Sequence, residues 1–188
     1  MSRVSHDGRR YNNADEDRVE LVDYDPGWPA LFEAEAARLR AILASLELGS
    51  FRLEHFGSTA IPGITAKPII DIMLVSADRS RWPELIDPIK SLDYVYWAEN
   101  PRSDRMFFVK GMPPFGTRHT HHVHVRTPED GHPALVFRDY LRDHPEAVTR
   151  YARLKRELEA RHQTDRDAYT AGKDGFVAEI VRAAAAGA

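Results

Sequence analysis

The segment Pro68–Val75 constrains the fold more than any other part of the chain, because its residues are almost all apolar. An apolar run without alternation is typical of a strand that is buried on both faces inside a sheet. Asp71 interrupts this run, and a carboxylate on a buried strand is costly unless it is paired or binds a cation. The sequence therefore predicts a central strand that carries a functional or ion-paired carboxylate, with Lys67 as a candidate partner.

A Gly-Ser pair lies ahead of this strand, at the end of a second predicted strand, Phe51–Phe56. Gly57 would let backbone N–H groups approach a ligand closely, and Ser58 and Thr59 add hydroxyl donors. His55 lies just before the pair and is a further candidate for the site. The alternative is an ordinary turn, with the carboxylate and the lysine in a structural ion pair.

Four histidines fall within six residues around a third predicted strand, His121–Arg126. Alternation along a strand would place His122, His124 and Arg126 on one face and two valines on the other. Two histidines on one face can share a ligand or a metal ion, although an exposed edge strand would show the same pattern. A zinc site would need a third ligand, for which Asp71 is the candidate.

Further cations and aromatic residues follow in the C-terminal part, which is predicted to be helical. Arg138 and Arg142 are four residues apart and would share a helix face, where they could clamp a phosphate or a carboxylate. They could equally form a solvated face that pairs with nearby acidic residues. Tyr151, Lys155 and Lys173 lie beyond them and could also face a ligand.

Apolar periodicity, turn residues and prolines predict the remaining elements. They are a weak strand at Val19–Val22, a helix from Pro29 to Leu46, a helix at Trp82–Leu92, strands at Tyr94–Ala98 and Arg105–Lys110, and helices from Pro133, from Pro145 and around Phe176. This order is typical of an α+β fold with a mixed sheet, an N-terminal helix and a C-terminal helical bundle. We expect a disordered lead at 1–17, a single domain at 18–182 and a flexible tail at 183–188.

The composition narrows the class of protein further. A chain of 188 residues with 43% hydrophobic residues can form one domain with a real core. A net charge of −3 provides no strong field toward nucleic acid or membranes, so neither is expected as a partner. The absence of cysteine excludes disulfides, thiolate metal sites and a cysteine nucleophile. Without a spanning segment or a signal-peptide core, the sequence indicates a cytoplasmic protein; it sets no oligomeric state.

Together, these motifs resemble the GrpB family, also called UPF0157, over roughly residues 19–181. The resemblance rests on the segments His55–Thr59, Pro62–Gly63, Lys67–Ile72, His121–Val125 and Phe137–Arg142, and on Tyr151, Leu154, Lys155 and Lys173. It implies a fold of the nucleotidyltransferase superfamily. In some bacteria a related domain is fused behind dephospho-CoA kinase, and the general biochemical role of the family is poorly defined.

Nucleotidyltransferases follow a Gly-Ser pair with a strand that bears two carboxylates, and a neighbouring strand adds a third. These carboxylates hold two magnesium ions. Here the Gly-Ser pair and Asp71 match, but Met73 takes the place of the second carboxylate and histidines stand on the neighbouring strand. Because magnesium prefers oxygen ligands, the resemblance implies a degenerate pocket without the two-magnesium centre. It leaves either no cofactor or one divalent ion on Asp71, His122 and His124.

We therefore expect an enzyme that performs acid–base chemistry on a small organic metabolite, by dehydration, addition or cyclisation. Asp71 and one of His122 or His124 would be the base and the acid, and Lys67 or His55 would tune their pKa values. The residues expected to bind the substrate are Gly57, Ser58, Thr59, Arg126, Arg138, Arg142, Tyr151 and Lys155. Two alternatives remain: nucleotidyl transfer to a small molecule, and a non-catalytic nucleotide-binding module.

Overall fold

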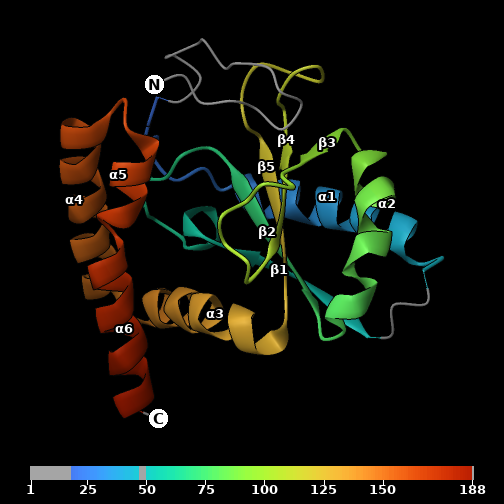
Figure 1. Cartoon of the computed structure of the whole chain (residues 1–188). Coiled ribbons are helices and arrows are strands. Elements are labelled where there is room, and N and C mark those ends of the chain that lie inside the picture. Colours follow the sequence, from blue (N-terminus) through green and yellow to red (C-terminus); the bar gives the residue numbers. More distant parts are fainter. Residues whose placement is uncertain (1–17, 47–49, 188) are drawn as a thin grey trace.

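A five-stranded mixed sheet lies at the centre of the computed structural model, which describes residues 18–46 and 50–187 (Figure 1). In spatial order the strands are β1 (Phe51–Phe56), β2 (Ile70–Ser76), β5 (His121–Arg126), β4 (Met106–Lys110) and β3 (Tyr94–Tyr96). β2 pairs antiparallel with β1 and parallel with β5, and the pairs β5–β4 and β4–β3 are antiparallel. The apolar strand is thus an inner strand, as predicted, whereas the expected lead at 1–17 lies outside the described residues.

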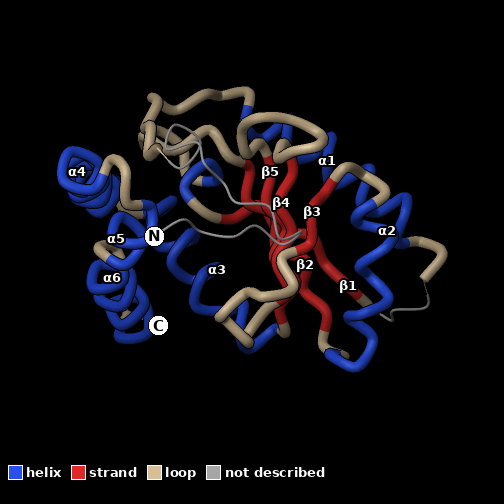
Figure 2. The backbone as a smooth tube through the Cα atoms, turned by 45° about the horizontal axis from the view of Figure 1, so that its top comes forward, coloured by secondary structure: helices blue, strands red, loops and turns tan. Residues whose placement is uncertain are grey.

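Helices cover both sides of this sheet (Figure 2). On one side lie α1 (Trp28–Leu43) and α2 (Ile86–Lys90), and on the other lie α3 (Pro128–Asp143), α4 (Pro145–His162), α5 (Arg166–Ala171) and α6 (Asp174–Ala186). Two 3-10 turns, η1 (Ser58–Ala60) and η2 (Arg79–Leu85), complete the elements of the described residues. The predicted α+β class, with one N-terminal helix and a helical end, is confirmed.

The main hydrophobic core lies between the sheet and the helices α1 and α2. Ile72 and Leu74 of β2, together with Val123 and Val125 of β5, are fully buried in it. Burying a side chain of this size contributes about 1.5–3 kcal/mol relative to leaving it exposed. Because successive side chains of a strand point to opposite faces, this core also fixes which residues of β2 and β5 face away from it.

On the opposite face, α3 covers the carboxyl-terminal part of β2. Met73 and Val75 pack there with Phe56 and with two residues of α3. Gly131 of α3 lies so close to the sheet that a Cβ atom would come within 2.6 Å of the Met73 sulfur. α3 therefore packs directly on Met73, and Asp71 lies farther along the same face toward the amino end of β2.

The C-terminal helices pack against the loop that joins β1 to β2. Ile61 and Ile64 of this loop are fully buried in a cluster with Tyr151 and Ile180. The predicted strand at Val19–Val22 is not a strand of the sheet: Val22 forms an isolated bridge with Ala66, and the Val19 N–H donates to Gln163 at the end of α4. The Gly-Ser loop is thus held between the sheet and the helical end.

Several helix boundaries differ from the prediction. α3 begins at Pro128 instead of Pro133, since the Thr127 hydroxyl accepts the Asp130 N–H. α5 was not predicted; the Asp165 side chain caps it by accepting a backbone N–H. α6 continues to Ala186, so most of the segment expected as a tail is helical. The predicted helix at 82–92 is divided into η2 and α2, each of which contains a proline.

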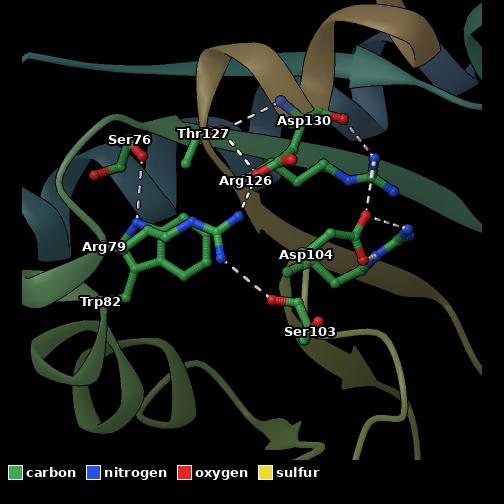
Figure 3. A network of polar contacts seen from close by, with 9 residues as sticks. Ser76, Arg79, Trp82, Ser103, Asp104, Arg126, Thr127 and Asp130 are labelled. Atoms are coloured by element: carbon green, nitrogen blue, oxygen red, sulfur yellow. Dashed lines mark hydrogen bonds and ion pairs between the residues drawn. The ribbon is translucent and has the colours of Figure 1, made fainter.

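We predict that Thr127→Ala lowers the free energy of unfolding by about 1 kcal/mol, as expected for the loss of a helix cap. The Thr127 hydroxyl accepts the Asp130 N–H at 3.2 Å and donates to the Asp130 carboxylate at 2.8 Å (Figure 3). Urea denaturation measures the change. Thr127→Ser keeps the hydroxyl and should retain most of the stability; an equal loss in both variants would contradict a capping role.

Candidate functional site

The parallel pairing of β2 with β5 brings Asp71 beside His122 and Met73 beside His124. The His122 Nδ1 atom lies 2.9 Å from the Asp71 Oδ1 atom, and the His124 Nε2 atom lies 3.7 Å from the same oxygen. An ionised carboxylate only accepts hydrogen bonds, so the His122 Nδ1–H donates to it. Asp71 and His124 therefore open to the same side of the sheet.

Aromatic residues and a third histidine hold these imidazoles in place. The Phe107 ring centroid lies 5.0 Å from that of His122 and 4.6 Å from that of His124. The His119 Nδ1 atom is 2.9 Å from His122 Nε2, which continues the hydrogen-bonded series Asp71–His122–His119. His119 was not predicted as a site residue, because it precedes the strand whose alternation was used. Its place in the four-histidine cluster was the available signal.

Burial controls the protonation of this cluster. Burial alone would raise the pKa of Asp71, but the hydrogen bond from His122 and the nearby His124 ring outweigh it and hold this pKa well below its usual range. For the histidines burial outweighs the attraction of Asp71, which lowers the pKa of His122 and brings that of His124 to about 4. The carboxylate is therefore ionised and both imidazoles are neutral at neutral pH. We expected Asp71 as the base and a histidine as the acid, whereas a neutral histidine beside an ionised carboxylate is suited to accept a proton.

Gly57 stands directly against the carboxylate of Asp71. Its φ angle is +72°, which side chains rarely adopt, and a Cβ atom there would come within 2.4 Å of the Asp71 Oδ2 atom. Both the backbone conformation and the close approach therefore require glycine. The Gly-Ser pair predicted from the sequence thus leaves room for the carboxylate.

His55 and Thr59 have contacts on the other side of this loop. The His55 ring stacks on Phe32 of α1, with centroids 4.8 Å apart, and its Nε2 atom lies 3.1 Å from the Thr59 hydroxyl. That hydroxyl donates to the Ile69 carbonyl oxygen at 3.1 Å, so it accepts from His55. Burial lowers the pKa of His55 to about 4, which keeps the ring neutral. These contacts give both side chains a part in holding the β1–β2 loop.

Lysines of the loop and of the helical end face the cluster. The Lys67 and Lys173 Nζ atoms lie 5.6 Å and 4.6 Å from the centroid of the Tyr169 ring. Burial lowers the pKa of Lys173 to about 8, although the Asp71 carboxylate opposes this, and Arg166 lowers it further. Lys67 also disfavours the protonated form of His122. Positive charge therefore surrounds the single carboxylate from several elements.

Ser58, Tyr151 and Lys155 form a second group on the same side. The Tyr151 hydroxyl forms a hydrogen bond with Ser58, while burial, the larger effect, raises the pKa of this tyrosine. Lys155 is 1% exposed; its Nζ atom donates to the Thr65 carbonyl oxygen and lies 5.0 Å from the Tyr151 ring centroid. Burial lowers the pKa of Lys155 to about 7. Lys155 thus binds the β1–β2 loop, whereas Lys173 is partly exposed.

The two arginines of α3 that were predicted to bind a ligand instead contact other parts of the protein. Arg138 pairs with Glu54 at 2.9 Å and donates to the His55 carbonyl oxygen at 2.8 Å. The Arg142 Nε atom donates to the Ala60 carbonyl oxygen at 3.0 Å. These contacts attach α3 to β1 and to the Gly-Ser loop. Both arginines also pair with the nearby Asp139, as the alternative expected, although Arg138 is buried rather than solvated.

Arg126, at the far end of β5, belongs to a polar network with the start of α3 (Figure 3). It donates to the Asp130 carbonyl oxygen at 2.9 Å and lies 3.7 Å from the Asp104 carboxylate. Arg79 joins the same network through the Asp130 carboxylate and the Ser103 carbonyl oxygen. Arg126 shares the face of the two strand histidines, as predicted, but its contacts connect α3 with the β3–β4 loop.

The donor atoms do not fit a two-magnesium centre. Met73 is fully buried against Phe56 and α3, in the position where a second carboxylate would be needed. Its thioether offers magnesium no suitable ligand, and the neighbouring strand presents nitrogen atoms. The Asp71, His122 and His124 ligand atoms do lie within 4.8 Å of one another, as a single ion would require.

A Gly-Ser turn between two strands, a carboxylate on the second strand and a parallel neighbour facing it form the mixed-sheet arrangement expected from the resemblance, with histidines where further carboxylates would stand. The model of the GrpB protein family matches residues 18–183, and the chain belongs to this family. The family predicted from the motifs, and its extent, are confirmed.

Individual relatives agree with this assignment. A UPF0157 protein of Pseudomonas aeruginosa is 51% identical over 93% of this chain and 71% of its own length. The crystal structure of the conserved protein GrpB from Enterococcus faecalis matches with a TM-score of 0.75 and 34% identity, over 88% of this chain and 96% of that one. A dephospho-CoA kinase of Mycolicibacterium paratuberculosis is 31% identical over 88% of this chain, which spans 46% of that protein. Within the described residues, we find no helix with the length and apolar character needed to cross a membrane.

We predict that Gly57→Ala destabilises the fold more than Gly63→Ala does. Both glycines have positive φ angles, of +72° and +77°, so each variant carries a backbone cost of about 1–3 kcal/mol. Only at Gly57 would the added Cβ meet Asp71, since nothing lies within 4 Å of a Cβ at Gly63. Urea denaturation measures the loss of unfolding free energy in both variants. The histidine NMR resonances should shift only in Gly57→Ala. Equal effects would show that the contact with Asp71 is unimportant.

Proposed function

We propose that this GrpB-family chain is an enzyme that performs acid–base chemistry on a small anionic organic metabolite. The observation that carries the proposal is the ionised carboxylate of Asp71 bonded to a neutral imidazole of His122 at 2.9 Å. A carboxylate that orients a neutral histidine prepares it to accept a proton and stabilises the imidazolium that results.

In this mechanism the proton acceptor is an imidazole of β5 rather than Asp71. The His122 Nδ1–H donates to Asp71, which leaves Nε2 as the basic atom, hydrogen-bonded to His119. A proton that reaches Nε2, directly or through the His119 ring, gives an imidazolium held by the carboxylate. His124 lies 3.7 Å from the same carboxylate and can support this charge distribution or take the proton itself.

Lys173 is the proposed proton donor and the proposed partner of an anionic substrate group. Its pKa of about 8 keeps it mostly protonated at neutral pH while allowing it to give up a proton. A proton removed from a carbon or oxygen atom by the imidazole, and one delivered by Lys173 to a leaving group or an acceptor atom, balance overall. Dehydration, addition and cyclisation of a carboxylate- or phosphate-bearing metabolite all follow this scheme.

Nucleotidyl transfer to a small molecule is the second candidate, because Ser58 and the lysines around Tyr169 could hold phosphate groups. Met73 argues against it, since the second carboxylate that holds magnesium in that reaction is replaced. A non-catalytic nucleotide-binding module would use the same cations without the histidines. Magnesium-dependent transfer that Asp71→Ala abolishes would favour the second candidate over acid–base chemistry.

We predict that Asp71→Asn, His122→Ala or His124→Ala lowers turnover by about a hundredfold or more, the usual contribution of a general acid or base. A panel of small carboxylates and phosphate esters, incubated in D2O and followed by NMR, reveals the substrate through proton exchange or conversion. His121→Ala, on the same strand but the opposite face, is the control and should remain active. Near-normal turnover in all three folded variants would show that these residues perform no acid–base chemistry, and the proposal would be wrong.

We predict a bell-shaped pH dependence of kcat/KM. Activity should rise with pH through a value below the ordinary histidine pKa of 6.5, because burial lowers the pKa of His122. It should fall as pH increases through about 8, where Lys173 loses its proton. Lys173→Gln should remove the alkaline decline along with most of the activity, whereas an unchanged decline would assign that limb to another group.

A further inference from the structure

The ligand atoms of Asp71, His122 and His124 have the arrangement of a metal site, and they are of a kind that magnesium does not prefer. The Asp71 Oδ1 atom lies 2.9 Å from His122 Nδ1 and 3.7 Å from His124 Nε2, and all three atoms are within 4.8 Å of one another. We infer that these three side chains bind one divalent transition-metal ion of the zinc, iron(II) or cobalt(II) class.

These distances suit a tetrahedral ion. Zinc binds imidazole nitrogen and carboxylate oxygen atoms at about 2.0–2.2 Å, which separates two ligands of a tetrahedron by about 3.4 Å. The two distances to the Asp71 oxygen, 2.9 and 3.7 Å, lie on either side of that value. The imidazole nitrogen atoms of His122 and His124, which lie within 4.8 Å of each other, would move toward the same separation around an ion.

The chemistry of the donors selects the class of ion. Two imidazoles and one carboxylate are the protein ligands of many catalytic zinc sites and of non-haem iron(II) sites. The chain has no cysteine, so soft thiolate coordination is excluded. Three protein ligands leave at least one position open, and the partly exposed Lys173 would favour an anionic group there.

The surroundings hold two of the ligands in position. With His122 Nδ1 on the ion, its Nε2–H would donate to His119 Nδ1, which lies 2.9 Å away, as expected of a histidine ligand supported by a second partner. His124 is positioned by packing instead, between the rings of Phe56 and Phe107 at 5.0 and 4.6 Å. Its Nδ1 atom is buried without a hydrogen-bond partner among the described residues, so no second hydrogen bond supports this ring.

This inference goes beyond the proposed function, because ion binding is measurable without a substrate. An ion at this site would make a bound water molecule more acidic, and that water would then be the base instead of an imidazole. The proposed acid–base role of the cluster holds in both cases. The two statements are therefore tested separately.

The experiment uses the full chain, freed of metal with a chelator and then titrated with cobalt(II) alone. We expect one cobalt ion per chain, with the visible absorption of tetrahedral cobalt, displacement by one equivalent of zinc and no displacement by a large excess of magnesium. Asp71→Asn and His124→Ala should each weaken binding by more than about a hundredfold, and His119→Ala by about 10–100-fold. His121→Ala is the matched control and should bind as tightly as the unaltered chain.

Circular dichroism identifies any variant that fails to fold, and the remaining variants decide the result. The inference is wrong if the chain binds neither cobalt nor zinc, or if binding survives in folded Asp71→Asn and His124→Ala. It is also wrong if His121→Ala loses binding to the same extent. Turnover that persists after complete removal of metal would leave the acid–base proposal intact while excluding a catalytic ion.

Discussion

The carboxylate of Asp71, placed inside an apolar strand, is the constraint on which the rest of this site depends. A partly buried charge requires partners, and the parallel pairing of β2 with β5 supplies them by aligning Asp71 with His122. Gly57 accommodates the same carboxylate by having no side chain. The turn at Gly57, the strand order and the histidines thus together accommodate one partly buried negative charge.

The two strands that carry the site also carry the main core. Val123 and Val125 are fully buried against α1 and α2, while His122 and His124 project from the opposite face of the same strand. A register shift of one residue would turn the valines away from this core and the histidines into it. The geometry of the cluster is therefore as rigid as the core itself, which is the arrangement that acid–base chemistry and metal binding both need.

Much of the arrangement of the candidate site could be predicted from the alternation of side chains along the strands, because the faces of β2 and β5 follow directly from their apolar residues. His55 could have been placed in the same way, since it shares a face of β1 with Phe51 and Leu53 and so points toward α1. The protonation of the histidines could not be predicted from the sequence, because it depends on how deeply Phe107 and the helical end bury the two rings. The position of Lys173 likewise follows from tertiary packing, which local sequence patterns do not encode.

The parts of the site are far apart in the chain, and this affects how it is assembled. Asp71 and His122 are separated by 51 positions, so their contact forms only when a long loop closes, and that is a slow kind of folding event. During synthesis the sheet strands are all made once residue 126 has been added, whereas Tyr169 and Lys173 are made later. A nascent chain can therefore pair the strands that carry Asp71 and His122 before Lys173 has been made.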